Sequence, residues 1–319
     1  MIRFLLSLCT LLLSFAALAQ PYPARPVKII VPFGPGGSAD TLGRLVAGKL
    51  ADQLNESFVI ENRGGAGGVV GSELVAKAPP DGYTLVVSGI ASHVIAPHLP
   101  NGTPYDPLKD FSHIALFGGP PAVVAVNPSL PAKTLKEFVA LAKEKPGKLT
   151  YGSPGPGTQG QLVMELFKRI AGIDVLHVPY KGAAAAVTDM MGGQISSVST
   201  TLSTAAGQIR GGRARGLALS SPERLPDYPD IPTFAEQGYK DIVATVWFSL
   251  SGPAGMPQEI IDKLNAEVRR AMELSDVRTR MRHDGIVPNR LDAKEFTAYV
   301  ADELRRWGPV VRVSGAKND

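Results

Sequence analysis

Short apolar runs alternate with longer segments of helical spacing along most of the chain, and this order restricts the fold more than any other feature. Val27 to Phe33 (VKIIVPF) is a nearly continuous apolar run, the pattern of a strand buried on both faces of a parallel sheet. From Ala39 to Leu54, leucine and valine recur with helical spacing. Because strands and helices alternate, the sequence predicts an α/β protein whose sheets, parallel or mixed, are covered by helices on both faces.

The elements after Leu54 repeat this order in two blocks. Strands are expected at residues 58–60, 85–88, 123–126, 149–153, 175–178, 195–199, 217–220 and 245–251. Helices are expected at residues 69–78, 135–143, 161–171, 183–191, 258–274 and 294–306, and Thr134 is the expected N-cap of the helix at 135–143. The blocks predict two lobes, one formed by residues 20–121 and 244–319 and the other by residues 122–243. We expect the chain to cross between them near residues 118–121 and 242–246.

Residues 1–19 have the pattern of a secretory signal peptide. Arg3 precedes an apolar run, and Ala17-Leu18-Ala19 supplies small residues for cleavage after Ala19. The run is shorter than the roughly 20 apolar residues that a membrane-spanning helix needs, so cleavage is favoured over a membrane anchor. Cys9, the only cysteine, would leave with this segment, which excludes disulfides and Cys-ligated metals in the mature chain. We expect an exported, periplasmic protein.

The charge of the chain excludes one class of partner. The formal net charge is +4 at pH 7, which becomes +3 when Arg3 is removed with the signal segment. Basic residues are scattered, and the sequence has neither the basic patch nor the aromatic–basic platform that nucleic-acid binding requires. Nucleic acid is therefore not an expected partner, and the mild positive charge is compatible with an anionic ligand.

Sequence signatures of catalysis and metal binding are absent. The five histidines are not spaced as a zinc pair, and neither HExxH nor the GxSxG nucleophile motif occurs. Carboxylate pairs for acid–base catalysis stay open, because such pairs assemble only in the folded chain. The sequence favours a binding protein over an enzyme, with no metal and no cofactor.

Two glycine-rich loops that join a strand to a helix are the candidate binding elements. The first is FGPGGSAD at residues 33–40, and the second is GSPGPGTQG at residues 152–160. In open α/β sheets a ligand lies beyond the carboxyl ends of the strands. The helix N-termini found there offer free N–H groups and partial positive charge to an anion. Either loop alone fits an ordinary tight turn, but one in each lobe predicts a cleft in which two helix N-termini hold a carboxylate.

Two side chains of the first loop have alternative roles. Ser38 is expected either to cap the following helix or to donate its hydroxyl to a ligand. Asp40 is expected to accept from backbone N–H groups and hold the loop shape, with acceptance from a ligand donor as the alternative. We favour the structural role for Asp40.

The second loop also contains a formal match to the dinucleotide-binding fingerprint, Gly155-x-Gly157-x-x-Gly160. Pro154 and Pro156 have no N–H group to offer a pyrophosphate. The strand expected at residues 175–178 is not followed by the acidic residue that would bind a ribose hydroxyl. A nicotinamide cofactor is therefore not predicted.

Longer motifs, in a fixed order over nearly the whole chain after residue 22, resemble the Bug family of periplasmic receptors (TctC-like) of tripartite tricarboxylate transporters. They are PARPVKIIVPFGPGGSAD at 23–40, VIENRGGAGGVVG at 59–71, PDGYTL at 80–85, YGS at 151–153, HVPYKG at 177–182, IPTFAE at 231–236 and GPAG at 252–255. The resemblance implies a two-lobed, type II-like Venus-flytrap fold that closes on a small carboxylate and docks to a membrane permease. Dicarboxylates, tricarboxylates and aromatic acids all stay open as ligands, and we expect a monomer.

The resemblance also implies which residues form the site, where the proximal carboxylate of the ligand is held largely by backbone groups and bound waters. In the first lobe it implies Phe33, Gly36, Gly37, Ser38 and Asp40. In the second lobe it implies Ser153, Gly155, Thr158 and Gln159.

One departure from the family pattern concerns the far end of the ligand. Many relatives have an aromatic-Asp-Asn-like stretch where this chain has Ser199-Thr200-Thr201. The hydroxyls of Thr200 and Thr201 suit a polar or carboxylate tail and offer no counter-charge to an amine, although both are equally typical of a plain strand. Ser88 and Ser92, at another strand end, are secondary candidates. The competing functions are a secreted hydrolase that acts on a carboxylate and a partner protein that senses one.

Overall fold

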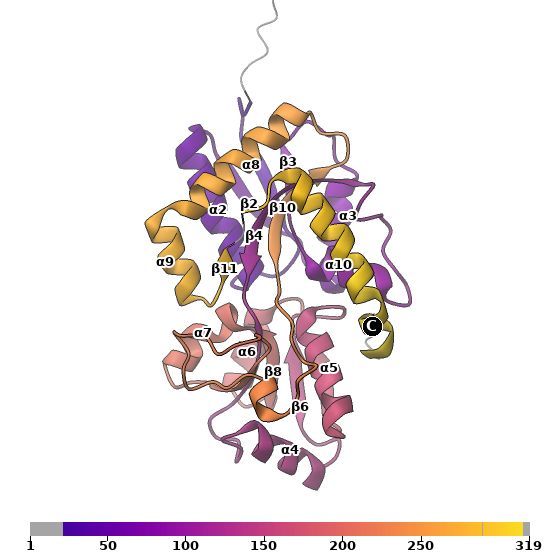
Figure 1. Cartoon of the computed structure of the whole chain (residues 1–319), viewed down its shortest axis with the longest axis vertical. Helices are drawn as coiled ribbons and strands as arrows, with labels where there is room; N and C mark the ends of the chain where they lie inside the picture. The colour runs from indigo at the N-terminus through magenta and orange to yellow at the C-terminus, as the bar shows by residue number, and fades with distance from the viewer. Residues whose placement is uncertain (1–21, 289, 315–319) are drawn as a thin grey trace, which may run out of the picture.

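The structure, a computed structural model, describes residues 22–288 and 290–314. It consists of two α/β lobes placed end to end along the long axis of the molecule (Figure 1). The signal segment predicted at residues 1–19, and its cleavage after Ala19, lie outside the described residues. Among the residues described, no helix is both long enough and apolar enough to cross a membrane.

The first lobe, the upper one in Figure 1, is built on a mixed sheet of six strands in the order β11-β4-β10-β3-β1-β2. Strands β1, β2 and β3 are parallel, and β10 runs antiparallel to both β3 and β4. The strands are β1 (Val27–Val31), β2 (Phe58–Asn62), β3 (Thr84–Gly89), β4 (Phe111–Gly119), β10 (Phe248–Pro253) and β11 (Val287–Pro288).

Helices cover both faces of this sheet because alternate strand residues point to opposite sides. Val27 and Ile29 of β1 pack in the core formed with α2 and α8, whereas Ile30 packs in a separate cluster with Val75 of α3. The helices are α2 (Ser38–Leu54), α3 (Val69–Ala76), α8 (Gln258–Glu273), α9 (Ser275–His283) and α10 (Ala293–Ser314).

The second lobe contains a mixed sheet of five strands in the order β7-β6-β8-β5-β9. Strand β6 is parallel to β7 and β8, and β5 is antiparallel to β8 and β9. The strands are β5 (Ala122–Val126), β6 (Thr150–Ser153), β7 (Leu176–Pro179), β8 (Ser197–Thr201) and β9 (Arg215–Leu219). The helices are α4 (Leu135–Glu144), α5 (Gln159–Ala171), α6 (Ala183–Met191) and α7 (Leu202–Arg210).

The prediction of two α/β lobes with mixed sheets is confirmed. Thr134 caps α4 as predicted, because its hydroxyl accepts from the Glu137 N–H at 3.1 Å. The expected strand at 245–251 begins later, at Phe248, because residues 245–247 belong to a crossing between the lobes. Strands β4 and β11 and helices α7 and α9 were not predicted from the sequence.

Two antiparallel segments connect the sheets. The chain leaves the first sheet after Gly119 and returns to it before Phe248. Between these points Pro121 forms a bridge with Thr245, and the Val246 N–H donates to the Pro120 carbonyl at 3.0 Å. The lobe boundaries predicted at 121/122 and 243/244 lie in these crossings and stay a prediction.

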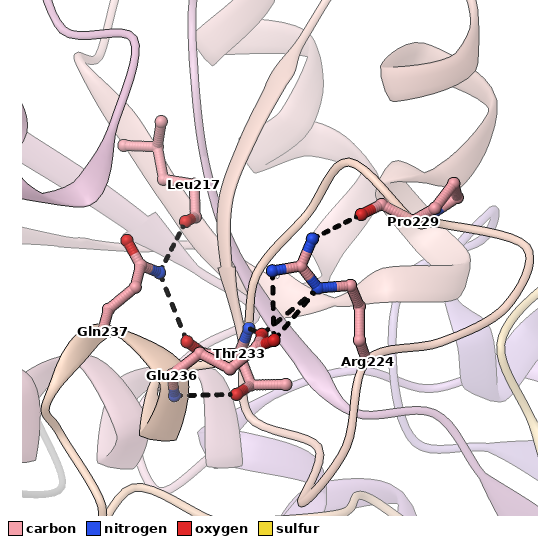
Figure 2. Close-up of polar contacts among 6 residues, drawn as sticks. All are labelled: Leu217, Arg224, Pro229, Thr233, Glu236 and Gln237. Atoms are coloured by element: carbon pink, nitrogen blue, oxygen red, sulfur yellow. Dashed lines mark hydrogen bonds and ion pairs between the residues drawn. The ribbon is translucent and has the colours of Figure 1, made fainter.

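The connection from β9 to the return crossing is fixed to the second lobe by a polar network (Figure 2). Glu236 accepts from the Thr233 N–H at 2.7 Å, and the Glu236 N–H donates to the Thr233 hydroxyl at 3.1 Å, so the two residues pair reciprocally at the start of the helical turn at 235–237. Arg224 pairs with Glu236 at 3.0 Å and donates to the Pro229 carbonyl at 2.7 Å. Gln237 ties the turn to the carbonyl of Leu217 in β9 at 3.0 Å. The IPTFAE motif thus fixes this connection to β9 of the second lobe.

Candidate functional site

A cavity lies between the two lobes and encloses about 530 Å³ of space not filled by atoms, part of it open to solvent. None of its lining residues is ionisable. The first lobe and its crossing contribute Phe33, Gly37, Ser38, Ala39, Gly89, Ile90, Ala91, Val246 and Phe248, and the second lobe contributes Pro154, Thr158, Gln159, Gly160, Ala183 and Thr201.

Helix N-termini from both lobes converge on this cavity. The first residues of α2, α5 and α6, namely Ser38, Gln159 and Ala183, all line it. The first turn of a helix has N–H groups without intrahelical acceptors and carries partial positive charge, so an anion is stabilised there. The structure therefore brings the two glycine-rich loops together around one space.

Gln159 is the lining side chain with the greatest unmet demand for hydrogen bonds. It is 2 % exposed, and within the described residues neither its Nε2 nor its Oε1 has a partner. Leaving a buried polar group unpaired costs about 1–3 kcal/mol. Gln161, two residues later in the same helix, has a hydrogen-bond partner, because its Oε1 accepts from the Gly157 N–H at 2.8 Å. A ligand with an acceptor atom in the cavity would pair with the Nε2 of Gln159.

Ser38 belongs to a cluster of hydroxyls that joins the lobes. Its Oγ lies 2.9 Å from Thr204 Oγ1 and also contacts Thr201 and Ser203, and the Ser38 N–H donates to Thr204 Oγ1 at 3.2 Å. The capping role considered for Ser38 is wrong, because Gly37 is the N-cap of α2 and makes no side-chain cap. Ser203 and Thr204 lie on α7, which was not predicted from the sequence; the hydroxyl residues on either side of Leu202, at 199–201 and 203–204, were the available signal.

Asp40 lies behind the first loop and does not line the cavity. Its Oδ2 accepts from the Gly36 N–H at 3.0 Å and from Arg44 Nε at 3.0 Å, while its Oδ1 accepts from Asn62 Nδ2 at 2.9 Å. Burial opposes ionisation of this carboxyl, but the hydrogen bonds from Arg44, Gly36 and Asn62 outweigh it and hold the pKa of Asp40 below its usual value. The geometry is that of a carboxylate that fixes the loop.

The second loop is held by its own side chains and lies against the first lobe. Ser153 Oγ is 2.7 Å from His177 Nε2, and the Thr158 hydroxyl donates to the Gly155 carbonyl at 2.7 Å. Gly157 has a φ of +67°, and a Cβ there would lie 2.5 Å from the Leu99 side chain of the other lobe. Glycine therefore permits both the turn and the close approach of the lobes.

Six of the predicted site residues line the cavity: Phe33, Gly37, Ser38, Thr158, Gln159 and Thr201. Ser88 lies instead inside the first sheet, where its hydroxyl is 2.7 Å from Ser249 Oγ, and Ser92 Oγ is 2.9 Å from His93 Nδ1. Thr200 is fully buried in β8. None of these three residues lines the cavity, and neither do Gly36, Asp40, Ser153 and Gly155.

The lining residues that the sequence analysis missed are mostly apolar. Ile90, Val246 and Phe248 carry no chemical group that distinguishes them from core residues. Val246 lies in the return crossing, and Phe248 is the first residue of the antiparallel strand β10. Only the tertiary arrangement places them beside the loops.

The lobes contact each other directly in two separate places. The Gly34 N–H donates to the Lys181 carbonyl at 2.9 Å. Away from the cavity, Tyr228 and Arg210 of the second lobe donate to the His283 carbonyl at the end of α9, at 2.7 and 2.9 Å. This is a closed arrangement of the clamp. Within 22–288 and 290–314, no group of three or more His, Cys, Asp or Glu side chains is placed to hold a metal ion.

Comparisons with known proteins agree with this geometry. A family model described as "Tripartite tricarboxylate transporter family receptor" matches residues 42–316. Protein BugT of Bordetella pertussis is 35% identical over 98% of this chain and 98% of its own length. The structure of the periplasmic binding protein BugD superposes with a TM-score of 0.89 at 30% identity, covering 93% of this chain and 100% of BugD. MatC from Rhodopseudomonas palustris, solved with bound malate, has a TM-score of 0.86 at 32% identity and covers 91% and 100%.

Proposed function

Because this chain belongs to the family of tripartite tricarboxylate transporter receptors, we propose that it captures a small carboxylate between its lobes and delivers it to a permease of that transporter type. The family consists of periplasmic solute-binding receptors, so the chain is a binding protein and not an enzyme, as the sequence predicted. MatC was solved with bound malate, a carboxylate of the proposed kind.

The observation that carries the proposal is the unpaired carboxamide of Gln159. The side chain is buried at the first residue of α5, and its Nε2 is a donor with no acceptor among the described residues. A carboxylate oxygen is the acceptor that this position favours, because the N-terminus of α5 adds partial positive charge at the same point.

The absence of ionisable lining residues supports an anion held by neutral groups. A carboxylate that leaves water needs several hydrogen bonds in return. The N-termini of α2 and α5 approach from different lobes and supply N–H groups in fixed positions. A ligand that bonds to both would select the closed state, since the open state offers it only one set of contacts.

Two substitutions of Gln159 test this function. Gln159→Glu places a second negative charge beside the carboxylate, and we expect a loss of affinity of at least a hundredfold. Gln159→Leu removes the donor without charge, and we expect a loss of about ten- to a hundredfold, since one hydrogen bond to a charged group contributes roughly 1.5–3 kcal/mol. Calorimetric titration with a panel of carboxylates measures both.

The matched control is Gln194→Glu, an exposed position in the same lobe. It adds the same charge away from the cavity and should bind as the unsubstituted protein does. Equal affinity of Gln159→Glu and Gln194→Glu for the best ligand would contradict the proposed site. Thermal unfolding with and without ligand provides a second measure, because a ligand of the folded state stabilises by mass action.

A further inference from the structure

Few side chains in the cavity lining carry polar atoms. The lining side chains with polar atoms are those of Ser38, Thr158, Gln159 and Thr201. The hydroxyls of Ser38 and Thr201 are bonded to each other and to Thr204, and the Thr158 hydroxyl donates to the Gly155 carbonyl. Among the described lining side chains, only Gln159 therefore keeps unpaired polar atoms. One carboxamide beside helix N-termini is enough for a single carboxylate.

The rest of the lining is apolar. Phe33, Ile90, Val246 and Phe248, together with Ala39, Ala91, Pro154 and Ala183, have no polar side-chain atom. Ile90, Val246 and Phe248 are 1 %, 5 % and 7 % exposed, so this part of the lining is shielded from water. A second carboxylate placed there would lose its hydration and meet neither a cation nor a free side-chain donor, which is strongly unfavourable.

We infer that the ligand of this receptor carries a single carboxylate joined to a small apolar body, such as a short alkyl chain or one aromatic ring. The carboxylate lies at Gln159 and the helix N-termini, and the apolar body lies against Ile90, Val246 and Phe248. This preference rests on the proposed function, because it takes the cavity as the ligand site. It separates the chain from MatC, whose malate is a dicarboxylate.

Pairs that consist of a monocarboxylate and a dicarboxylate with the same carbon skeleton, chain or ring, test the preference. Hexanoate is compared with adipate, and benzoate with terephthalate, by calorimetric titration of the whole mature protein. We expect the monocarboxylate of at least one pair to bind ten times more tightly than its dicarboxylate, and neither dicarboxylate to bind more tightly than its partner. Dicarboxylates that bind as tightly as their partners, or more tightly, would overturn the inference and leave the receptor function intact. If no acid of these pairs binds, and no member of a wider carboxylate panel binds, both the inference and the proposed function fail.

A charge introduced into the apolar part of the lining gives an independent test. Val246→Lys places a cation beside the body of the ligand and should shift the dicarboxylate-to-monocarboxylate affinity ratio upward by at least tenfold. Val243→Lys, three residues earlier in the same crossing and 38 % exposed, is the matched control and should keep the original ratio. An equal ratio in both variants would count against the inference.

A second variant covers the case in which Val246→Lys does not fold. Ala91→Ser adds one hydroxyl donor next to Ile90, in the apolar part of the lining, with little added volume. The affinity ratio should rise in the same direction, by about threefold. An unchanged dicarboxylate-to-monocarboxylate affinity ratio in this variant would also contradict the inference, because the only change is a hydrogen-bond donor added to the lining.

Discussion

His113 illustrates how single polar residues of the first lobe are satisfied away from the cavity. Its Nε2 lies 3.0 Å from the Pro107 carbonyl, and its Nδ1 lies 3.1 Å from Ser251 Oγ. Because a carbonyl only accepts, Nε2 carries the proton and Nδ1 accepts from the serine. The Ser251 hydroxyl is in turn 2.6 Å from that of Ser88. The neutral imidazole thus completes a buried chain of hydroxyls inside the sheet.

Stability should fall in mild acid because of this residue. Burial lowers the pKa of His113 to about 4, and the pKa of His93 is also lowered, by burial and by the nearby His113. The unfolded chain therefore binds protons that the folded chain excludes, so this contribution is complete above about pH 6.5 and is lost as the pH falls toward 4. For His113 alone the loss approaches about 3 kcal/mol. Urea unfolding between pH 7.5 and 4.5 measures it.

The comparison for this pH dependence is His113→Gln, which keeps a donor and an acceptor but does not titrate. Its stability should depend less on pH than that of the unsubstituted protein. Parallel curves for the protein and His113→Gln would show that the burial of this imidazole does not control acid stability.

At the scale of elements, the sequence predicted what local patterns encode. The continuous apolar run of β1 and the glycine loops before α2 and α5 are local signals, and their positions were predicted correctly. Strand β4 was missed because Ser112 and His113 interrupt its apolar pattern, although His113 is buried. Helix α7 was missed because it begins at Leu202, directly after β8, with no turn residue between them. Its contribution to the cleft depends on tertiary packing, which no local pattern contains.

Helix α7 leads to a prediction about closure. Ser38 and Thr204 are bonded only while the lobes are together, at 2.9 Å between the hydroxyls and 3.2 Å from the Ser38 N–H. The double variant Ser38→Ala, Thr204→Val should weaken ligand binding about tenfold, since it removes roughly 1–1.5 kcal/mol from the closed state. Its urea midpoint without ligand should change little. Calorimetry and small-angle scattering, with and without ligand, measure affinity and closure.

Thr188→Val is the control for this pair, because it removes an exposed hydroxyl from α6 that bonds only within its own helix. The control should bind ligand normally. Normal affinity in the double variant as well would mean that the hydroxyl cluster does not contribute to closure.

At the scale of the molecule, the clamp depends on how closely its two crossings approach. The site draws residues from both lobes, and the crossings set the orientation in which α2 and α5 meet. Gly119, at the end of β4, packs directly against the return crossing, and a Cβ there would lie 1.7 Å from the Val246 carbonyl oxygen. Val246 also lines the cavity. A change in the spacing of the crossings therefore alters both the closing motion and the apolar part of the lining.

Gly119→Ala should accordingly impair ligand binding, because the new methyl group meets backbone that cannot rotate away. We expect at least a tenfold loss of affinity in the folded protein, with a lower unfolding temperature. Gly48→Ala is the matched control, since a Cβ on that position of α2 meets nothing within 4 Å. In a helix interior this substitution should stabilise by about 0.5–1 kcal/mol and leave affinity unchanged. If both variants bind ligand equally well, the spacing of the crossings does not control closure, and the orientation of the lobes is set by the direct contacts between them.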